Sequence, residues 1–221
     1  MRLSSVLTSF LLQFFGAGYL QGLDGRNDTA NARGTGGFLQ LVNYVSGLSG
    51  GSWAVGSLAM NDWTTVQTLH DEVWALDVGI LSPATGSADT FRRASVADAN
   101  AKAAAGAEVS LIDPWGRQLS SHFLNSSYPN AGQTAQWTDI TKTQAFSSAT
   151  YPFPLITTLS YQNGSPGSNG NGTIIELNPY ETGSYDANVA AFIPTSIFGT
   201  PLNNGASQGT NSQCVYGLSN A

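Results

Sequence analysis

The sequence predicts a domain that mixes α-helices and β-strands. A strand-like run enters a glycine-rich turn near residue 49 and continues into a helix, helical periodicity returns in the middle of the chain, and two β-rich segments follow. The length of 221 residues suits one domain, or a large part of one, with enough chain to bury a hydrophobic core. No internal repeat and no long linker divide the sequence.

The first predicted elements lie between Gly36 and Met60. Apolar residues at helical spacing indicate a short helix over 38–42, and Tyr44–Ser46 has the composition of a short strand. Helical spacing resumes from Trp53 to Met60. This segment is therefore expected to form a strand, a turn and a helix in succession.

Further elements follow along the chain. Apolar spacing predicts a helix over Val66–Ile80, and alanine content predicts another over Phe91–Glu108. Asp113-Pro114 is expected to interrupt helical structure, and Trp115–Leu124 forms the next predicted helix.

The C-terminal half contains the two β-rich segments. Paired prolines and β-branched residues predict a strand within Thr150–Ser160, and Thr173–Leu177 alternates as a strand should. Between them, Gln162–Gly172 is rich in Gly, Ser and Asn and is predicted to be a surface loop.

Charge and composition exclude some functions. The net charge is −6, only 8 residues are Lys or Arg, and no basic cluster exceeds the pair Arg92-Arg93. Recognition of nucleic acid, or of an anionic membrane by charge alone, is therefore not expected. Charged residues make up 10% of the chain against roughly a quarter in an average soluble domain, so the polar surface depends on Ser, Thr, Asn, Gln and Gly. That composition is common in secreted glycoproteins.

The N-terminus has features of a secretory signal. Met1-Arg2 precedes an apolar run over Val6–Phe15 and the small residues Gly16-Ala17-Gly18, and the run is too short to span a bilayer. The alternative is a buried first helix of the domain. We therefore expect residues 1–15 to be a signal-like or otherwise separate segment and residues 16–221 to form the domain.

Four Asn-X-Ser/Thr sequons favour export to the secretory pathway, giving a secreted or cell-surface protein. Asn27, Asn125 and Asn171 are the predicted glycosylation sites, whereas Pro166 directly after the sequon of Asn163 disfavours its use. The single cysteine, Cys214, cannot form an internal disulfide; it either pairs with a cysteine outside this chain or is a buried thiol.

Gly47-Leu48-Ser49-Gly50-Gly51 matches the G-x-S-x-G pattern of a nucleophile elbow. A serine on a sharp strand-to-helix turn has strained backbone angles, and the neighbouring glycines let the chain pass without Cβ clashes. The following helix directs its N-terminal amides towards developing negative charge on the serine oxygen. Ser49 is the predicted nucleophile, with Gly47, Gly50 and Gly51 supporting the elbow and the oxyanion.

The pattern alone has little specificity, because Gly205-Ala206-Ser207-Gln208-Gly209 also satisfies it. That copy lies among polar residues and is predicted to be a loop. The two histidines are weak candidates for a catalytic base: His70 is expected on the polar side of a helix, and His122 is expected to pack or cap locally. A Ser-His-Asp triad within this chain is therefore poorly supported.

The residues around Ser49 resemble the nucleophile segment of fungal phospholipase B (lysophospholipase) and of the related cytosolic phospholipase A catalytic domain. Further segments follow in the order of that family. They are Gly16-Ala17-Gly18, Leu23-Asp24-Gly25-Arg26, Gly36-Gly37-Phe38-Leu39-Gln40 leading into Tyr44-Val45, Asp113-Pro114-Trp115-Gly116-Arg117-Gln118-Leu119-Ser120, Tyr151-Pro152-Phe153-Pro154, Glu176-Leu177-Asn178-Pro179-Tyr180-Glu181, Gly183-Ser184-Tyr185-Asp186 and Cys214-Val215.

The resemblance implies an α/β fold related to patatin, with a central sheet flanked by helices and a Ser-Asp dyad in place of a triad. It implies hydrolysis of fatty acyl esters of lysophospholipids and phospholipids through an acyl-serine intermediate, without metal or cofactor. The partners it implies are the phospholipid or lysophospholipid substrate and, transiently, a membrane or micelle surface.

The chain also departs from the family. Met1–Phe15 stands where the family has a glycine-rich oxyanion segment ending in an arginine, and the isolated Arg2 is no substitute. The chain ends before the segment that carries the family's catalytic aspartate, and Asp113 and Asp186 belong to other motifs. We therefore expect a partial catalytic domain, truncated at both ends and inactive by itself.

Two other functions stay open at this stage. One is a compact serine esterase in which Ser49 pairs with His70 or His122. The other is a non-catalytic fragment of a secreted glycoprotein.

Overall fold

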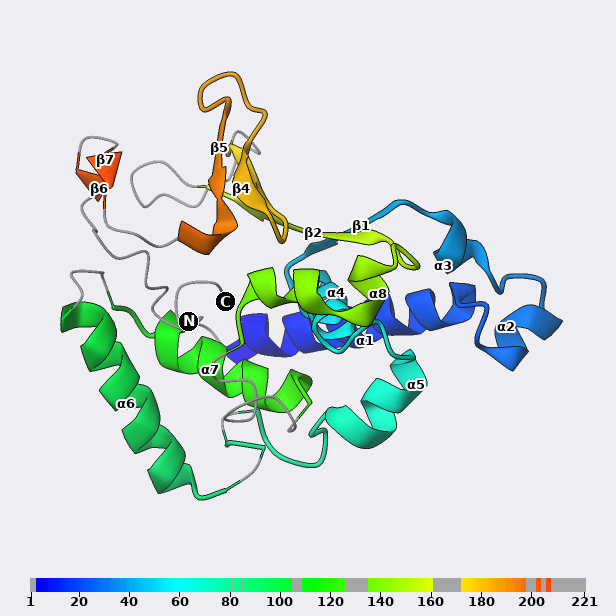
Figure 1. The fold of residues 1–221 in the computed structure, drawn as a ribbon. Coiled ribbons are helices and arrows are strands. Elements are labelled where there is room, and N and C mark those ends of the chain that lie inside the picture. Colours follow the sequence, from blue (N-terminus) through cyan, green and yellow to red (C-terminus); the bar gives the residue numbers. More distant parts are fainter. Residues whose placement is uncertain are drawn as a thin grey trace. The chain divides into compact units, whose positions relative to one another are not determined.

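The computed structural model describes residues 3–80, 82–84, 86–104, 109–125, 135–160, 172–197, 202–203 and 206–207 (Figure 1). The chain divides into two compact units. The first unit comprises residues 1–67 and 138–195, and the second comprises residues 68–137 and 196–221. The first unit contains the sheet and the segment around Ser49.

The first unit combines helices with a five-stranded sheet. Its helices are α1 (Leu3–Leu23), α2 (Asp28–Ala32), α3 (Phe38–Leu41), α4 (Gly50–Met60) and α8 (Gln144–Ser147). Its strands are β1 (Tyr44–Leu48), β2 (Phe153–Leu159), β3 (Ile174–Leu177), β4 (Glu181–Ser184) and β5 (Ala191–Pro194). The short helices α5 (Val66–Thr68) and η3 (Trp137–Lys142) lie where the chain passes between the units.

The strands follow the order β1-β2-β3-β4-β5 across the sheet. β1 and β2 are parallel, with Tyr44 opposite Phe153 and Leu48 opposite Thr157, and every later pair is antiparallel. A parallel pair needs a long crossover connection, and here the chain between β1 and β2 supplies it. The prediction of a mixed fold with a central sheet and flanking helices is confirmed.

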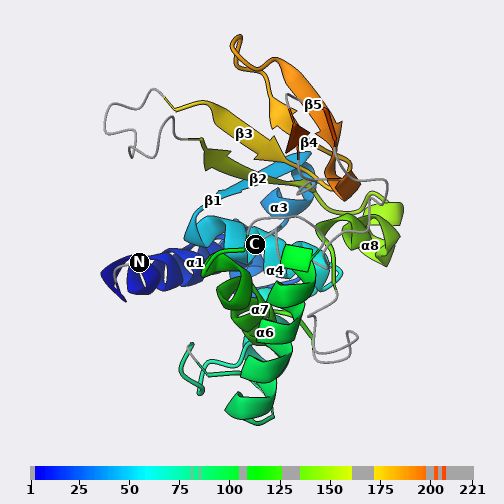
Figure 2. The ribbon, with the colours of Figure 1, turned by 90° about the vertical axis from the view of Figure 1, so that its left-hand side faces the viewer.

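The core of the first unit forms where α1 and α4 pack together along one side of the β1–β2 pair (Figure 2). Small residues on α1 and α4 allow this close packing, and larger apolar side chains fill the remaining space. The buried apolar residues include Ala17, Ala54, Val55, Leu58, Ala59, Met60 and Trp63.

The helix α1 crosses the boundary between residues 15 and 16, where we expected the family segment to begin. Its sequence contains no charged residue. No helix among the described residues combines the length and the apolar character that crossing a membrane requires.

The second unit contains η1 (Leu69–Val73), α6 (Ala88–Ala104) and α7 (Ile112–Phe123). The short helix η4 (Thr195–Ile197) begins at the last residue of the first unit and continues into the second. It also contains the two-residue strands β6 (Leu202–Asn203) and β7 (Ala206–Ser207), which pair antiparallel. The helix predicted for residues 91–108 corresponds to α6, and its last residues, 105–108, lie outside the described residues.

The helix predicted for residues 66–80 is wrong in its second half. Helical structure ends at Val73, and Trp74 is extended at φ −74° and ψ 119°. Buried Trp74 packs against the ring of Phe123 with centroids 6.3 Å apart, and the Ala75 N–H donates to the His122 carbonyl at 3.2 Å. Tertiary contacts with α7 therefore override the helical spacing of the apolar residues.

The expected interruption at Asp113-Pro114 is also wrong. The helix α7 begins at Ile112 and contains both residues in its first turn. Proline is tolerated there because the first backbone N–H groups of a helix have no intrahelical acceptor.

Candidate active site

Ser49 lies at the junction between β1 and α4, which confirms the predicted strand–serine–helix arrangement. Its backbone angles are φ 55° and ψ −126°, and it stands directly before Gly50, the first residue of α4. A positive φ is uncommon for a residue other than glycine and is maintained only where the surrounding structure enforces it. The Ser49 side chain is exposed at the end of a strand that pairs in parallel with β2.

The turn requires a glycine at residue 47, two positions before Ser49, because the α4 backbone passes close to it. A Cβ at residue 47 would lie 2.5 Å from the Gly51 carbonyl oxygen and 2.7 Å from the Ser52 Cα. These are backbone atoms of α4, so they cannot rotate away as a flexible side chain could. Gly47 therefore lets the first turn of α4 pass directly over β1.

The other glycines of the elbow differ from this expectation. A Cβ at Gly51 would meet no atom within 4 Å, so space does not require glycine there. Gly50 and Gly51 are both part of α4, and neither has a positive φ. Their place in the first turn leaves their amides among the N–H groups that lack an intrahelical acceptor, which fits the predicted oxyanion support.

The strand side of the elbow is fixed by β2. The Phe153 N–H donates to the Asn43 carbonyl at 2.8 Å, and the Thr157 hydroxyl donates to the Gly47 carbonyl at 3.2 Å. These bonds hold both ends of β1 and so fix the point at which the chain turns into α4.

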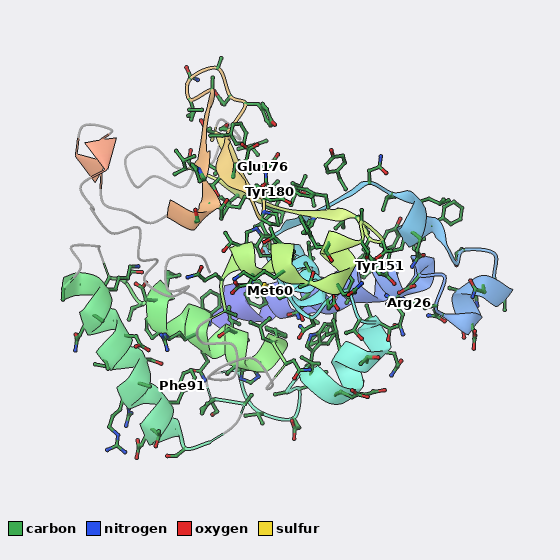
Figure 3. The ribbon with its side chains drawn as sticks, viewed as in Figure 1. Arg26, Met60, Phe91, Tyr151, Glu176 and Tyr180 are labelled. Carbon is green, nitrogen blue, oxygen red and sulfur yellow. The ribbon has the colours of Figure 1, made fainter. Side chains whose placement is uncertain are left out.

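The far end of α4 is held by Arg26, which the sequence indicated only as part of a family segment. Arg26 Nη1 donates to the Trp63 carbonyl at 2.8 Å, and Nη2 donates to Asp24 Oδ2 at 2.6 Å. The guanidinium carbon lies 4.8 Å from the centre of the Tyr151 ring (Figure 3). The Tyr151 ring stacks on Trp63 with centroids 5.6 Å apart. We define Asp24, Arg26, Trp63 and Tyr151 as the arginine cluster; it joins the chain just beyond α4 to the segment between α1 and α2 and to the residues before β2.

Asp24 is the buried acid of the arginine cluster, with 3% of its surface exposed. Burial alone would raise its pKa, but hydrogen bonds from the Arg26 side chain and backbone and from Gln40, with the charge of Arg26, hold the pKa below its ordinary value. The Gln40 amide donates to Asp24 Oδ1 at 2.8 Å. Asp24 is therefore a structural carboxylate, ionised and fully engaged.

The histidines have local roles. His122 is 1% exposed, and its Nδ1 and Nε2 lie 3.0 Å and 2.7 Å from the carbonyl oxygens of Ala75 and Ser82. With both nitrogens directed at carbonyl oxygens of the same unit, the ring packs locally, as predicted. His70 Nδ1 lies 2.7 Å from Asp71 Oδ1 in an exposed pair on η1.

The two aspartates of the other motifs also have structural roles. Asp113 is buried, forms an ion pair with Lys102 and accepts a hydrogen bond from the Ser110 N–H at 2.7 Å. Asp186 Oδ1 accepts from the backbone and side-chain nitrogens of Asn188 at 2.9 and 3.0 Å. Among the described residues, no group of three or more His, Cys, Asp or Glu side chains could hold a metal ion.

Comparison with known proteins identifies the family of this chain. The family model described as "Lysophospholipase catalytic domain" matches residues 11–221. The chain belongs to this lysophospholipase family. The match begins in α1, five residues before the boundary expected from the sequence at residue 16.

Fungal lysophospholipases are similar to this chain over most of its length. Lysophospholipase 2 of Saccharomyces cerevisiae is 37% identical over 216 residues, and a lysophospholipase of Torulaspora delbrueckii is 38% identical over 214 residues. Each alignment covers 93% of this chain but only 30% and 33%, respectively, of the relative. The chain thus spans about a third of the length of these lysophospholipases.

The fold resembles that of human GIVD cytosolic phospholipase A2. The TM-score is 0.58 at 16% sequence identity, over 89% of this chain and 24% of the human chain. At this identity the likeness establishes the fold, and it confirms the α/β fold with a sheet and flanking helices that the sequence predicted for a partial lysophospholipase domain.

The predicted glycosylation sites differ in their surroundings. Asn125 is exposed at the end of α7. Asn27 is half-buried rather than exposed, because its Oδ1 caps α2 by accepting from the N–H groups of Thr29 and Ala30, and its Nδ2 donates to the Gln21 carbonyl at 3.1 Å. Asn163, Asn171 and Cys214 lie outside the described residues.

The second G-x-S-x-G copy is not simply a loop, as the sequence suggested. Ser207 lies in the two-residue strand β7, paired with β6. It does not occupy a junction between a strand and a described helix, which distinguishes it from Ser49.

Proposed function

We propose that this protein is the nucleophile-bearing part of a lysophospholipase that hydrolyses fatty acyl esters of lysophospholipids and phospholipids. The observation that carries the proposal is Ser49 in a strained turn between a parallel strand and the N-terminus of an eleven-residue helix. Membership of the lysophospholipase family supports the choice of a lipid ester as substrate.

The proposed reaction has two steps. The Ser49 oxygen attacks the acyl carbonyl carbon and its proton passes to a base. The bond to the glycerol oxygen then breaks, the base gives the proton to this oxygen, and an acyl-serine remains. Water then attacks the acyl-serine and gives a proton to the base, which returns it to the serine oxygen as the fatty acid leaves. The N-terminal amides of α4, which begins directly after Ser49, are the proposed donors to the negative charge of each tetrahedral intermediate.

The base is proposed to be an aspartate from polypeptide outside residues 1–221, as the family's Ser-Asp dyad implies. The engagement of both other-motif aspartates in local structure supports this choice: Asp113 is paired with Lys102 and the Ser110 N–H, and Asp186 accepts from the Asn188 N–H. A second oxyanion donor is proposed to come from outside the chain as well. A single oxyanion donor contributes about 2.7–4 kcal/mol to transition-state stabilisation, so a chain without base and second donor should be nearly inactive.

The test compares the 221-residue chain with a chimera, in which residues 11–221 replace the matching segment of Saccharomyces cerevisiae lysophospholipase 2. The chain alone should not release fatty acid from lysophosphatidylcholine, whereas the chimera should. Ser49→Ala should abolish release by the chimera, and Ser147→Ala, at an exposed serine of α8, should not.

Two results would contradict the proposal. A chimera that stays folded and active after Ser49→Ala does not use this serine as its nucleophile. Turnover by the 221-residue chain that disappears with Ser49→Ala would mean that the base lies within these residues.

The proposal also places the protein on the secretory route, as a secreted or cell-surface glycoprotein acting transiently at membranes or micelles. The sequons and the exposure of Asn125 support this location. The substrate chemistry supports the surface, because phospholipids and lysophospholipids are present in water mainly as bilayers and micelles.

A further inference from the structure

The ring of His122, on α7, contacts two backbone carbonyls that lie near the two ends of one irregular segment. Its Nδ1 lies 3.0 Å from the Ala75 carbonyl oxygen, and its Nε2 lies 2.7 Å from the Ser82 carbonyl oxygen. The segment, described over residues 75–80 and 82–84, contains neither helix nor strand there, and we call it the clamped segment. One buried side chain therefore joins both ends of this segment to α7.

The two ends of the clamped segment are held differently. At the first end, the Ala75 N–H also donates to the His122 carbonyl at 3.2 Å. At the second end, the Ala84 N–H reaches Ser121 Oγ only at 3.4 Å, which is long for a hydrogen bond. The Ser82 end therefore depends on the His122 ring more than the Ala75 end does.

The two contacts of the ring distinguish its two charge states. A neutral imidazole has one N–H and one nitrogen lone pair, whereas the protonated ring has two N–H groups. In the neutral ring, one nitrogen lone pair therefore faces a carbonyl oxygen at hydrogen-bond distance, and the two repel each other. In the protonated ring both contacts are hydrogen bonds from a cationic donor, which are roughly twice as strong as neutral ones. The geometry around His122 is therefore complementary to the protonated ring.

The place of His122 in α7 also favours a positive charge. The residue is 1% exposed, and burial by itself opposes protonation. It lies, however, in the last turn of α7, where backbone carbonyls without intrahelical donors attract a cation. The two carbonyl acceptors and the end of the helix act together against the cost of burial.

The ring has no ion-pair partner among the described residues, where its hydrogen bonds go to the two carbonyls. The helices α6 and η1 pack against α7, and the charged groups of these elements and of the clamped segment pair with one another or are exposed. These groups are Asp89, Arg92, Arg93, Asp98 and Lys102 of α6, Asp113 and Arg117 of α7, His70, Asp71 and Glu72 of η1, and Asp77 of the clamped segment. The carbonyls and the helix end, rather than a carboxylate, therefore govern the charge of His122.

We propose that His122 is a pH-dependent clamp. The protonated ring donates to the Ala75 and Ser82 carbonyls together and holds both ends of the segment on α7. When the ring loses a proton, the Ala75 end cannot move away, because its N–H stays bound to the His122 carbonyl. The remaining proton therefore stays on Nδ1, and the Ser82 carbonyl moves away from the Nε2 lone pair. The Ser82 end should change from ordered to mobile between about pH 5 and pH 8, where histidine titrates. This inference goes beyond the proposed reaction and does not depend on it.

NMR relaxation of the 221-residue chain, combined with a titration of the ring nitrogens, tests the proposal. At about pH 5 both ring nitrogens of His122 should carry a proton, and the amide order parameters of Ser82 and Ala84 should be near the rigid value of about 0.85. At about pH 8 these two order parameters should fall below about 0.6, while that of Ala75 stays near about 0.85. The loss of the ring proton and the loss of order should have the same midpoint.

The second of the two histidines in the chain provides a matched control. His122→Gln presents one uncharged amide at every pH and should remove the pH dependence of order at Ser82 and Ala84. His70→Gln, at an exposed histidine of η1 in the same unit, should leave that dependence unchanged. If His122→Gln does not fold, the shared midpoint in the parent chain and in His70→Gln decides.

Three results would overturn the proposal. Equal order of Ser82 and Ala84 at both pH values would mean that the charge of the ring does not hold the segment. An order that increases with pH would mean that burial opposes the charge more strongly than the carbonyls favour it. A pH dependence that persists in folded His122→Gln, or disappears in His70→Gln, would assign the effect to another group.

Discussion

At the scale of single residues, the elbow depends on Gly47 more than on the other glycines around Ser49. A methyl group at residue 47 would collide with the α4 backbone, whereas one at residue 51 has open space. Gly47→Ala should therefore lower the free energy of unfolding by about 1–3 kcal/mol, as overpacking of a rigid site does. Gly51→Ala should be neutral or stabilising by about 0.5–1 kcal/mol, because alanine is the better helix former. Urea unfolding of both variants makes the comparison, and equal losses would refute the steric explanation.

Asp24 provides a second prediction at the residue scale, this time with a dependence on pH. Its folded-state pKa is depressed, so it stabilises the fold above its unfolded-state pKa of about 3.9 and loses this contribution as the pH falls towards the folded-state value. Asp24→Asn should therefore be less stable than the parent chain at pH 7, and the difference should shrink below about pH 4. Urea unfolding across this range measures it; a difference that does not change with pH would argue against the ion pair with Arg26.

At the scale of elements, α6 is attached to α7 by charge. The only buried residues of α6 are Ser95 and Lys102, and both ion pairs of the contact, Lys102–Asp113 and Asp98–Arg117, join the two helices. Burial lowers the pKa of Arg117, although the neighbouring Asp98 raises it. A helix attached with so little apolar contact depends on its buried charges remaining paired.

Breaking the buried pair should therefore detach α6. Lys102→Met leaves Asp113 buried without its cation and should cost about 3–5 kcal/mol, whereas Lys102→Met with Asp113→Leu should recover most of the loss. Hydrogen exchange over residues 88–104 reports the detachment separately from global unfolding. If the single and double variants are equally destabilised, the ion pair is not what holds the helix.

At the scale of the whole molecule, the proposed secretory route predicts N-linked glycans. Enzymatic deglycosylation of protein from its native host should lower the apparent mass. Asn125→Gln should remove part of that shift, because Asn125 is exposed at the end of α7. Asn27→Gln should also affect stability, because Asn27 caps α2, and loss of a cap costs about 0.5–2 kcal/mol. An unchanged mass after deglycosylation would contradict the secretory proposal.

The sequence by itself determined the local structures around Ser49 and the family of the chain. Tyr44–Ser46, the glycine-rich turn and the apolar residues from Trp53 predict β1, the elbow and α4, because each depends on neighbours in sequence. The strands β2 and β3 were predictable for the same reason.

Only the tertiary structure decided the features that depend on distant residues. The helix over 66–80 stops at Val73 because Trp74 and Ala75 bind to α7, about 50 positions further on, and no local pattern records such a contact. Arg26 holds the chain just beyond α4 only because folding brings Trp63 and Tyr151 to its side. The order β1-β2-β3-β4-β5 is likewise a property of the sheet, since strand order arises from long-range pairing rather than from the residues of any one strand.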